Sequence, residues 1–246
     1  MKLIISPAKK MTVDTDSFDV ASRPQLLPET TQLLATLQHM SYPELHELWH
    51  CSDRLAQQAY QQLQRTTLTD QLTPAILAYS GIQYQHMAPG VFTASALDYV
   101  QEHLRILSGF YGALRPFDGI VPYRLEMQAA LPVNEHPNLY DFWGAKPKQA
   151  LQLHDEPIIN LASQEYSKVI RRHLQPTEPI IDIRFGHVVD GKIKTRATFA
   201  KMARGEMVRF LAENKITQLD DLKQFSWSNY HFVAQESSAT TFVFLH

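Results

Sequence analysis

Residues 107–127 read LSGFYGALRPFDGIVPYRLEM. The apolar residues Leu104, Ile106 and Leu107 run into a Ser-Gly step, which predicts a buried strand that ends there. Three of the nine glycines of the chain fall in this segment, together with two prolines. Glycine lets a backbone approach a ligand closely, and proline holds a loop in one shape. We interpret the segment as a strand exit followed by a shaped loop, and long ordered loops are usually functional.

The end of this loop carries side chains able to hold a ligand. Arg124 and Glu126 are two residues apart, so they lie on the same side of the chain if the segment is extended. Glu126 is then expected to orient Arg124 against a phosphate or carboxylate, or to act as a base itself. The alternative is a buried loop whose charges satisfy one another. The candidate catalytic residues are Tyr123, Arg124, Glu126 and Asn160, and the expected loop pocket contains Ser108, Gly109, Tyr111 and Ser163.

Strands and helices alternate along the rest of the chain. Apolar runs predict strands at residues 2–6, 75–79, 157–161, 231–234 and 241–245, and two strand arms within 180–196. Caps and apolar spacing predict helices at residues 41–49, 55–64, 95–104, 163–172, 198–213 and 219–225. We therefore predict one α/β domain over residues 1–246, a mixed sheet flanked by helices, with α+β character at the C-terminal end.

Polar residues follow two of the predicted strands at the points where those strands end. Lys9 and Lys10 come shortly after the first strand, and Asn160 and Ser163 lie at the junction of a later strand with its helix. Ligands of α/β folds gather beyond the carboxyl ends of strands, and a helix N-terminus offers free N–H groups to an anion. The alternatives are an ordinary polar loop and a serine that only caps its helix.

The clearest local signal is the pair Asp190-Gly191 between two β-rich arms, which predicts a type I′ hairpin. In that register His187 opposes Lys194 on a face that carries further cations. Lys201 and Arg204 are three apart on the following predicted helix and share a surface. These residues predict a basic patch, for which the alternative is a merely solvated hairpin face.

Composition limits the classes of function. The chain has 23 Lys and Arg against 25 Asp and Glu, a formal net charge of −2, which argues against an indiscriminate polyanion binder. A nucleic-acid role would need cations gathered on one face. A single cysteine, Cys51, excludes an internal disulfide and favours a reducing compartment. No segment has the pattern of a signal peptide or a membrane span, so we expect a soluble, cytoplasmic protein.

His46-Glu47-Leu48-Trp49-His50 matches the H-E-x-x-H metalloprotease pattern. No third ligand follows at a familiar distance, and the predicted helix breaks near Cys51. Surface histidines and an idle thiol are the better interpretation. We expect neither a metal site nor a cofactor.

Several motifs occur together in a recognisable order. They are residues 6–9 (SPAK), 107–127, 139–144 (LYDFWG), 160–163 (NLAS) and 200–205 (AKMARG). In this combination the chain resembles, over essentially its whole length, the YaaA family of bacterial peroxide-stress proteins.

The resemblance implies a cytosolic protein made during hydrogen peroxide stress that limits the free iron responsible for oxidative DNA damage. It also implies DNA binding by a helix-hairpin-helix element and a positively charged cleft in an unusual α/β fold. This chain lacks the Gly-x-Gly turn typical of that element. The nearest candidate is residues 78–84, AYSGIQY, with a single glycine.

Three functions remain open at this stage. The first is sequence-independent binding of double-stranded or structured DNA by a monomer, through Lys9, Lys10, Arg124, Lys194, Lys201 and Arg204. The second is an enzyme that acts on a nucleotide, nucleobase or other anionic small molecule in a strand-end pocket around Arg124 and Glu126. The third, direct iron handling by His46, His50 and Cys51, has the weakest support because the cluster lacks carboxylate or thiolate density.

Overall fold

The computed structural model describes residues 1–246, and its centre is an eight-stranded mixed sheet. Seven strands follow the order β4-β3-β1-β6-β7-β10-β9, and β8 pairs with the outer part of β7. The neighbours from β3 to β10 are parallel, whereas β4 and β9 are antiparallel additions at the two edges. The strands are β1 (Lys2–Ile5), β3 (Leu104–Ser108), β4 (Gly112–Leu114), β6 (Ile158–Asn160), β7 (Ile180–Val189), β8 (Lys192–Lys194), β9 (His231–Phe232) and β10 (Thr241–Leu245). The predicted mixed sheet is confirmed.

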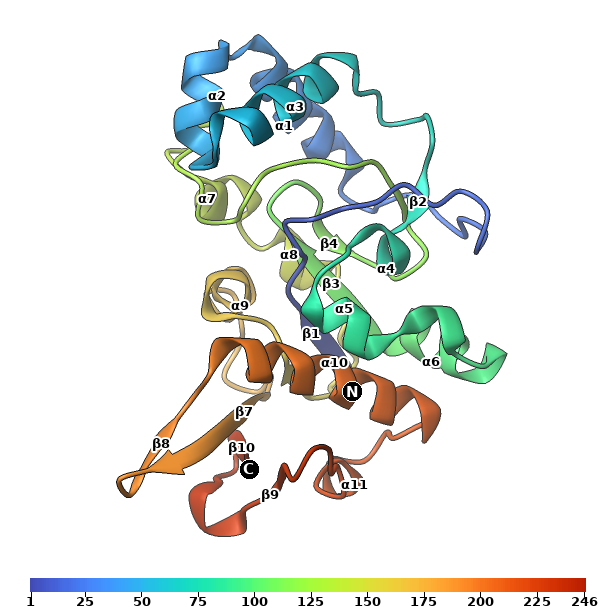
Figure 1. Cartoon of the computed structure of the whole chain (residues 1–246), viewed down its shortest axis with the longest axis vertical. Helices are drawn as coiled ribbons and strands as arrows, with labels where there is room; N and C mark the ends of the chain where they lie inside the picture. Colours follow the sequence, from blue (N-terminus) through green and yellow to red (C-terminus); the bar gives the residue numbers. More distant parts are fainter.

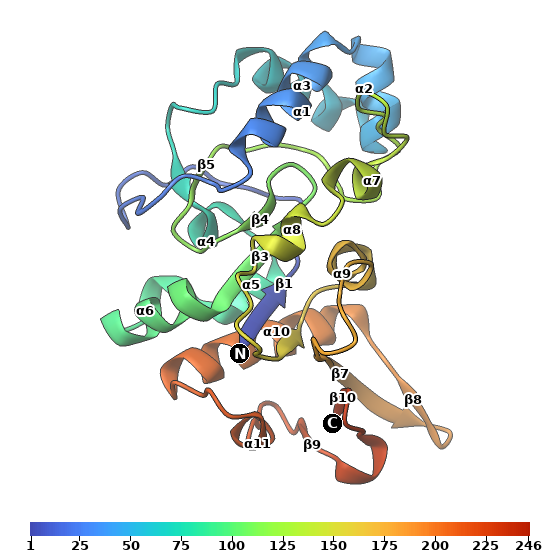
Figure 2. The same ribbon diagram turned by 180° about the vertical axis from the view of Figure 1, so that it is seen from behind.

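Helices cover both faces of this sheet. The long helix α10 crosses the face turned to the viewer in Figure 1, with α5 and α6 beside it, whereas α8 and α9 lie in front in Figure 2. Helices α1 to α3 gather at one end of the molecule, opposite the β7–β8 hairpin. The helix bounds are α1 (Leu27–His39), α2 (Tyr42–Trp49), α3 (Asp53–Arg65), α4 (Ala75–Ala78), α5 (Ile82–Met87), α6 (Ala94–His103), α7 (Leu139–Trp143), α8 (Lys146–Gln149), α9 (Gln164–Arg171), α10 (Ala197–Glu213) and α11 (Leu219–Leu222). None of them has the length and apolar composition needed to cross a membrane.

The central strands are buried on both faces, as parallel strands covered by helices must be. Every residue of β1, β3 and β6 is buried. Their runs of leucine and isoleucine therefore need no alternation of apolar and polar side chains. By contrast, the tip of the β7–β8 hairpin extends beyond the core, and Val188 is 56% exposed. The buried core of the sheet thus lies on the side of β1.

Local signals in the sequence are mostly confirmed. The carboxylate of Glu44 accepts hydrogen bonds from the N–H and the hydroxyl of Ser41, which closes the predicted capping box of α2. In the hairpin, His187 pairs with Lys194, and Asp190 and Gly191 have positive φ angles of 51° and 71°, as a type I′ turn requires.

One predicted strand is wrong. Residues 75–79 form the short helix α4 followed by Tyr79, which makes only an isolated bridge with Met11. A short apolar run does not distinguish a strand from a buried helical turn, since both hide every side chain. As a result, α4 and α5 are joined by only three residues, 79–81. The strands β2 (Thr73–Pro74) and β5 (Gly119–Ile120) form a separate small pair beside it.

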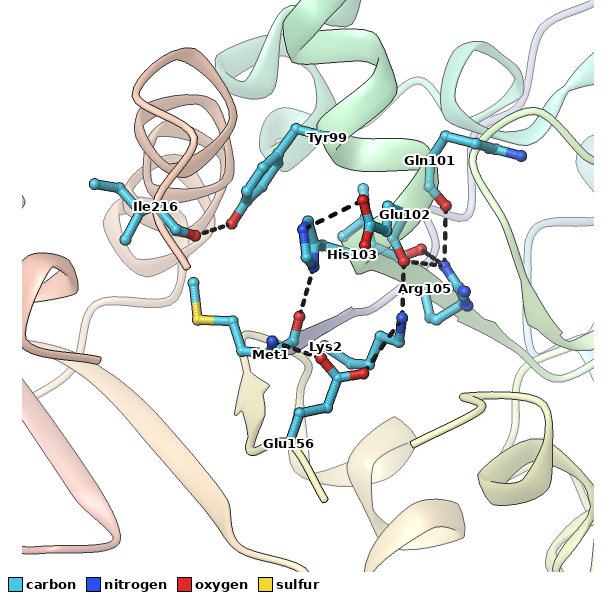
Figure 3. Close-up of polar contacts among 10 residues, drawn as sticks. Met1, Lys2, Tyr99, Gln101, Glu102, His103, Arg105, Glu156 and Ile216 are labelled. Carbon is cyan, nitrogen blue, oxygen red and sulfur yellow. Dashed lines mark hydrogen bonds and ion pairs between the residues drawn. The ribbon is translucent and has the colours of Figure 1, made fainter. Parts of the chain in front are cut away.

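A buried ionic cluster holds the beginning of β1 (Figure 3). The α-amine of Met1 lies 2.6 Å from a carboxylate oxygen of Glu156, and Lys2 Nζ lies 3.3 Å from the other. His103 Nδ1 contacts the carbonyl oxygen of Met1 at 2.9 Å. The amine is fully buried, so Glu156 neutralises charge that water cannot reach. This cluster lies at the amino end of the parallel strands, away from the edge where β1 and β6 end.

Helices α5 and α10 approach each other unusually closely at Gly205. A Cβ atom there would lie 2.1 Å from the carbonyl oxygen of Gln83 and 2.9 Å from the amide nitrogen of Met87. Only glycine allows this approach without a backbone shift. The contact fixes the distance between the first turn of α5 and the face of α10 that carries Lys201 and Arg204.

Candidate functional site

The order of the strands creates a crevice where β1 and β6 end. The chain passes from β1 to β3 on one side of it and then crosses to β6 on the other side. Such a switch point is where open α/β sheets bind ligands, because the connecting loops diverge there. A hydrogen bond joins the two loops: the Ser163 N–H donates to Ser6 Oγ at 2.8 Å. Both residues line the cavity that opens at this point.

This cavity, which we call the cleft, has a volume of about 510 Å³. Its walls are residues 6–10 after β1, 80–84 at the start of α5, 123–126 of the loop, the start of α9 at 163, 165 and 166, and residues 201 and 204 of α10. The volume falls within the range typical of small-molecule sites. Segments far apart in the sequence thus build one site.

Positive charge predominates in the cleft. Five cationic side chains line it against two carboxylates, and they are Lys9, Lys10, Arg124, Lys201 and Arg204. The Nε atoms of Arg124 and Arg204 are buried and have no hydrogen-bond partner. Burial lowers the pKa of Arg204, and the charge of Asp182 offsets part of that effect. A buried donor without a partner costs free energy, so both arginines keep unused hydrogen-bonding capacity beside the cleft.

The two carboxylates of the cleft have different partners. Glu126 Oε1 lies 2.5 Å from Lys9 Nζ, so the expected pairing of Glu126 with Arg124 is wrong. The alternation of side chains along residues 123–126 could not predict that Glu126 pairs with a lysine from the loop after β1. Glu165 Oε1 accepts a hydrogen bond from the N–H of Gln128 at 3.3 Å. Burial raises the pKa of Glu165, and the charge of Glu126 adds to the rise while Lys9 opposes it.

A buried hydroxyl network holds the loop against the sheet. The hydroxyl of Tyr123 lies 2.7 Å from Ser108 Oγ and 2.8 Å from the hydroxyl of Tyr79. Burial raises the pKa of Tyr123 to about 12, so its phenol stays protonated. A Cβ atom at Gly109 would lie 2.6 Å from the carbonyl oxygen of Leu125, so glycine is required for the loop to pass so closely. Within the segment 107–127, Ser108 and Gly109 therefore help to hold Tyr123 and Leu125 in place.

Most of the residues singled out in the sequence meet in the cleft. Those that line it are Lys9, Lys10, Tyr123, Arg124, Glu126, Ser163, Lys201 and Arg204. They come from three strand-end loops and one helix, which is the placement that strand-end reasoning predicts.

Five candidates do not line the cleft. Ser108, Gly109 and Tyr111 lie behind the loop; the Tyr111 hydroxyl accepts a hydrogen bond from the N–H of Val121. Asn160 is buried, donates to Asp182 at 2.7 Å and accepts from the N–H of Ala162, so it shapes the β6 exit. Lys194 lies on β8. Ser108, Gly109, Tyr111 and Asn160 therefore do not form the expected pocket, because a strand-end position does not fix the direction of a side chain. Lys194 stays a predicted DNA- or anion-binding residue outside the cleft.

Other residues that line the cleft were not predicted from the sequence. Ser80 and Gly81 occupy the turn before α5, and Tyr84 donates from its hydroxyl to the carbonyl oxygen of Ser6 at 2.9 Å. Glu165 and Tyr166 lie in the first turn of α9. The only available signals were the Ser-Gly step within residues 78–84 and an acidic residue just after a predicted helix cap.

The histidines of the H-E-x-x-H pattern have ordinary structural roles. His46 Nε2 contacts the carbonyl oxygen of Cys51 at 3.0 Å, and His50 ends α2 in a left-handed conformation with φ of 43°. No group of three or more His, Cys, Asp or Glu side chains is arranged to hold a metal ion.

Known proteins resemble this chain along its whole length. The family described as peroxide stress protein YaaA matches residues 1–236. A UPF0246 protein of Lactiplantibacillus plantarum is 59% identical over 246 residues, covering 100% of this chain and 99% of the relative. UPF0246 proteins of Lacticaseibacillus casei and Agathobacter rectalis are 55% and 47% identical, with coverage of 99% or more of this chain and 98% or more of each relative. The chain therefore belongs to the YaaA family of peroxide stress proteins.

Proposed function

We propose that this protein acts in the peroxide stress response by binding a phosphate-bearing ligand, a nucleotide, in the cleft. The observation that carries the proposal is the meeting of five cationic side chains around one cavity in which two buried guanidinium Nε–H groups have no acceptor. Arginine pairs with phosphate through two parallel hydrogen bonds, so two such groups select a doubly charged oxyanion over a neutral ligand.

The remaining walls suit the same ligand. Ser6 and Ser163 place hydroxyl groups at the switch point, and Lys9 reaches the cleft with 70% of its side chain exposed. A phosphate that approaches Lys9 competes with Glu126 for its ammonium group. If the protein catalyses a reaction of this ligand, Glu126 and Glu165 are the candidate general acid and base of the cleft, and the raised pKa of Glu165 favours its protonated form. Tyr123 is a positioning residue, because Ser108 and Tyr79 occupy its hydroxyl.

Replacement of Arg204 by methionine tests this proposal. A hydrogen bond to a charged group contributes about 1.5–3 kcal/mol, so we expect Arg204→Met to weaken pyrophosphate binding by about 10- to 100-fold in titration calorimetry. The unliganded variant should melt no earlier than the wild type, because the substitution removes a buried cation that has no ion-pair partner.

Arg209→Met is the matched control. Arg209 lies on the same helix but pairs with Glu213 and does not line the cleft. It should leave the affinity for pyrophosphate unchanged. Equal affinity in Arg204→Met and wild type, or no binding of pyrophosphate by the wild type at millimolar concentration, would contradict the proposal.

DNA binding through the same cleft is the second candidate, and one observation favours it. Two short helices, α4 and α5, are joined by residues 79–81, and Ser80 and Gly81 of this connection line the cleft together with Lys10 and Lys201. Helix-hairpin-helix elements also meet phosphates with the connection between two helices, although this connection has one glycine in place of the Gly-x-Gly turn. In this second candidate function, a cytoplasmic protein binds DNA without sequence preference and limits the damage that iron causes to the DNA.

Salt dependence distinguishes the two candidates. If duplex DNA lies across the cleft, Lys201→Ala should weaken its binding and lower the slope of log affinity against log salt by roughly 0.9, the value for one lost phosphate contact. Lys215→Ala, at the other end of α10, is the control. Lys194→Ala shows whether the hairpin takes part. An unchanged slope in Lys201→Ala would remove duplex DNA from the cleft.

A further inference from the structure

A second cavity adjoins the cleft on the other side of the loop. Its volume is about 180 Å³, and it shares Lys9, Tyr123 and Arg124 with the cleft. The rest of its wall comes mainly from α1, α2 and α3, so we call it the cap cavity. A third hollow of about 280 Å³ also contains Lys9 and Arg124, and it is lined by Trp49 as well. Lys9 and Arg124 therefore border the cleft and also two spaces lined in part by residues of these helices.

Trp49 is the residue that the cap cavity and the third hollow have in common besides the two cations. Only 6% of Trp49 is exposed, yet its Nε1–H has no hydrogen-bond partner. Buried tryptophans normally find an acceptor, as Trp143 does by donating to the carbonyl oxygen of Gly109 at 2.9 Å. Indole nitrogen only donates, so the absent partner is an acceptor.

Apolar side chains predominate in the cap cavity, and the polar residues Gln62 and Thr66 also line it. Leu34, Leu37, Leu63 and Phe110 line its interior, and exposed Gln58 lies at its wall on α3. Its volume equals that of about six liquid waters at about 30 Å³ each. A flat ring system fills such a space and pairs its apolar faces with leucine and phenylalanine side chains.

We infer that the ligand of this protein has two parts: an anionic group held in the cleft and a planar ring, bearing a hydrogen-bond acceptor, that enters the cap cavity and accepts from Trp49 Nε1–H. The anionic half of this inference rests on the proposed function. Lys9 and Arg124 border both spaces and hold the junction of the two parts. The ligand class is thus a nucleotide recognised through its base as well as its phosphates.

The test compares ADP with pyrophosphate, which share the anion but not the ring. In titration calorimetry the wild type should bind ADP about tenfold more tightly than pyrophosphate, a gain in the range of base stacking on aromatic groups. Trp49→Phe should lose about 3- to 10-fold in ADP affinity, the effect of one lost hydrogen bond, with pyrophosphate affinity unchanged. ADP should also change the fluorescence of the wild type, and that change should be absent in Trp49→Phe.

Two further variants keep the result interpretable. Trp227→Phe, a tryptophan outside both cavities, should retain the fluorescence change and both affinities. Ala59→Leu adds volume to the wall of the cap cavity without removing a contact, and it should reduce ADP affinity to that of pyrophosphate even if Trp49→Phe is unstable.

The outcomes separate this inference from the proposal on which it rests. Equal affinity of the wild type for ADP and pyrophosphate, or unchanged ADP affinity in both Trp49→Phe and Ala59→Leu, overturns the inference and leaves the anion site in place. Failure of the wild type to bind either probe overturns both.

Discussion

Alanine at Gly205 is expected to lower the free energy of unfolding by about 3 kcal/mol, the upper part of the usual range for overpacking a tight contact. The added Cβ atom would lie 2.1 Å from the carbonyl oxygen of Gln83, a backbone atom that no side-chain rotation can move away. Helices α5 and α10 must separate to relieve the clash. Because α10 carries Lys201 and Arg204, and α5 follows Ser80 and Gly81, separation widens the cleft and should also weaken pyrophosphate binding.

Thermal and urea denaturation measure this effect. For a chain of this size about 3 kcal/mol corresponds to a fall in Tm of roughly 6–12 °C. Gly90→Ala is the control, since no atom lies within 4 Å of a Cβ atom at that position and its φ is not positive. It should change the free energy of unfolding by less than about 0.5 kcal/mol. A Gly205→Ala variant as stable as Gly90→Ala would mean that the two helices do not meet as described.

Removal of the Glu156 carboxylate should have a comparable effect at the other end of the sheet. Glu156→Ala leaves the Met1 amine and Lys2 buried without an opposite charge, and the loss of one partner of a buried pair costs about 3 kcal/mol or more. Denaturation in urea at pH 7 measures the loss. Glu135→Ala, at an exposed carboxylate, should be close to neutral.

The pH dependence of this loss follows from the pKa of Glu156. Burial alone would raise that pKa, but the hydrogen bond from the Met1 amine and the charges of Lys2 and Met1 outweigh burial and lower it below its ordinary value of 4.5. A lowered folded-state pKa contributes stability that is present above the unfolded pKa and is lost as the pH falls through the folded one. The difference in stability between wild type and Glu156→Ala should therefore be constant near pH 7 and shrink below about pH 4.5. A difference that persists unchanged to pH 3 would argue against the ion pairs.

Sequence reasoning succeeded where a short-range rule determines the structure. The hairpin at Asp190 and Gly191 follows from backbone conformations that few residues adopt, and the capping box at Ser41 follows from a four-residue pattern. It failed at residues 75–79, because burial on all sides gives a helix and a strand the same apolar composition. Turns and caps can be predicted from a few neighbouring residues, whereas a completely buried segment shows no alternation of apolar and polar residues from which to assign its secondary structure.

The candidate site shows the same division. Lys9 was found because ligands gather beyond the ends of parallel strands, whereas Lys201 was found because it lies three residues from Arg204 on one helix. Asn160 and Ser108 are the last residues of β6 and β3, but their side chains are engaged by Asp182 and Tyr123 inside the protein. Trp49 belongs to a helix that lines the same cavity as residues 122–124, which no local pattern predicts.

The hydrogen bond between Ser6 and Ser163 also has a consequence for biosynthesis. The two residues are 157 positions apart, so the cleft cannot close while the ribosome is still making the intervening segment. At typical elongation rates that interval is roughly 8–30 seconds. The nascent β1, entirely apolar after Lys2, has no sheet neighbour until β3 is made at residues 104–108, and it lacks β6 until residue 160. The binding site can therefore form only late in synthesis, after this strand has stayed without one or both of its neighbours for most of that time.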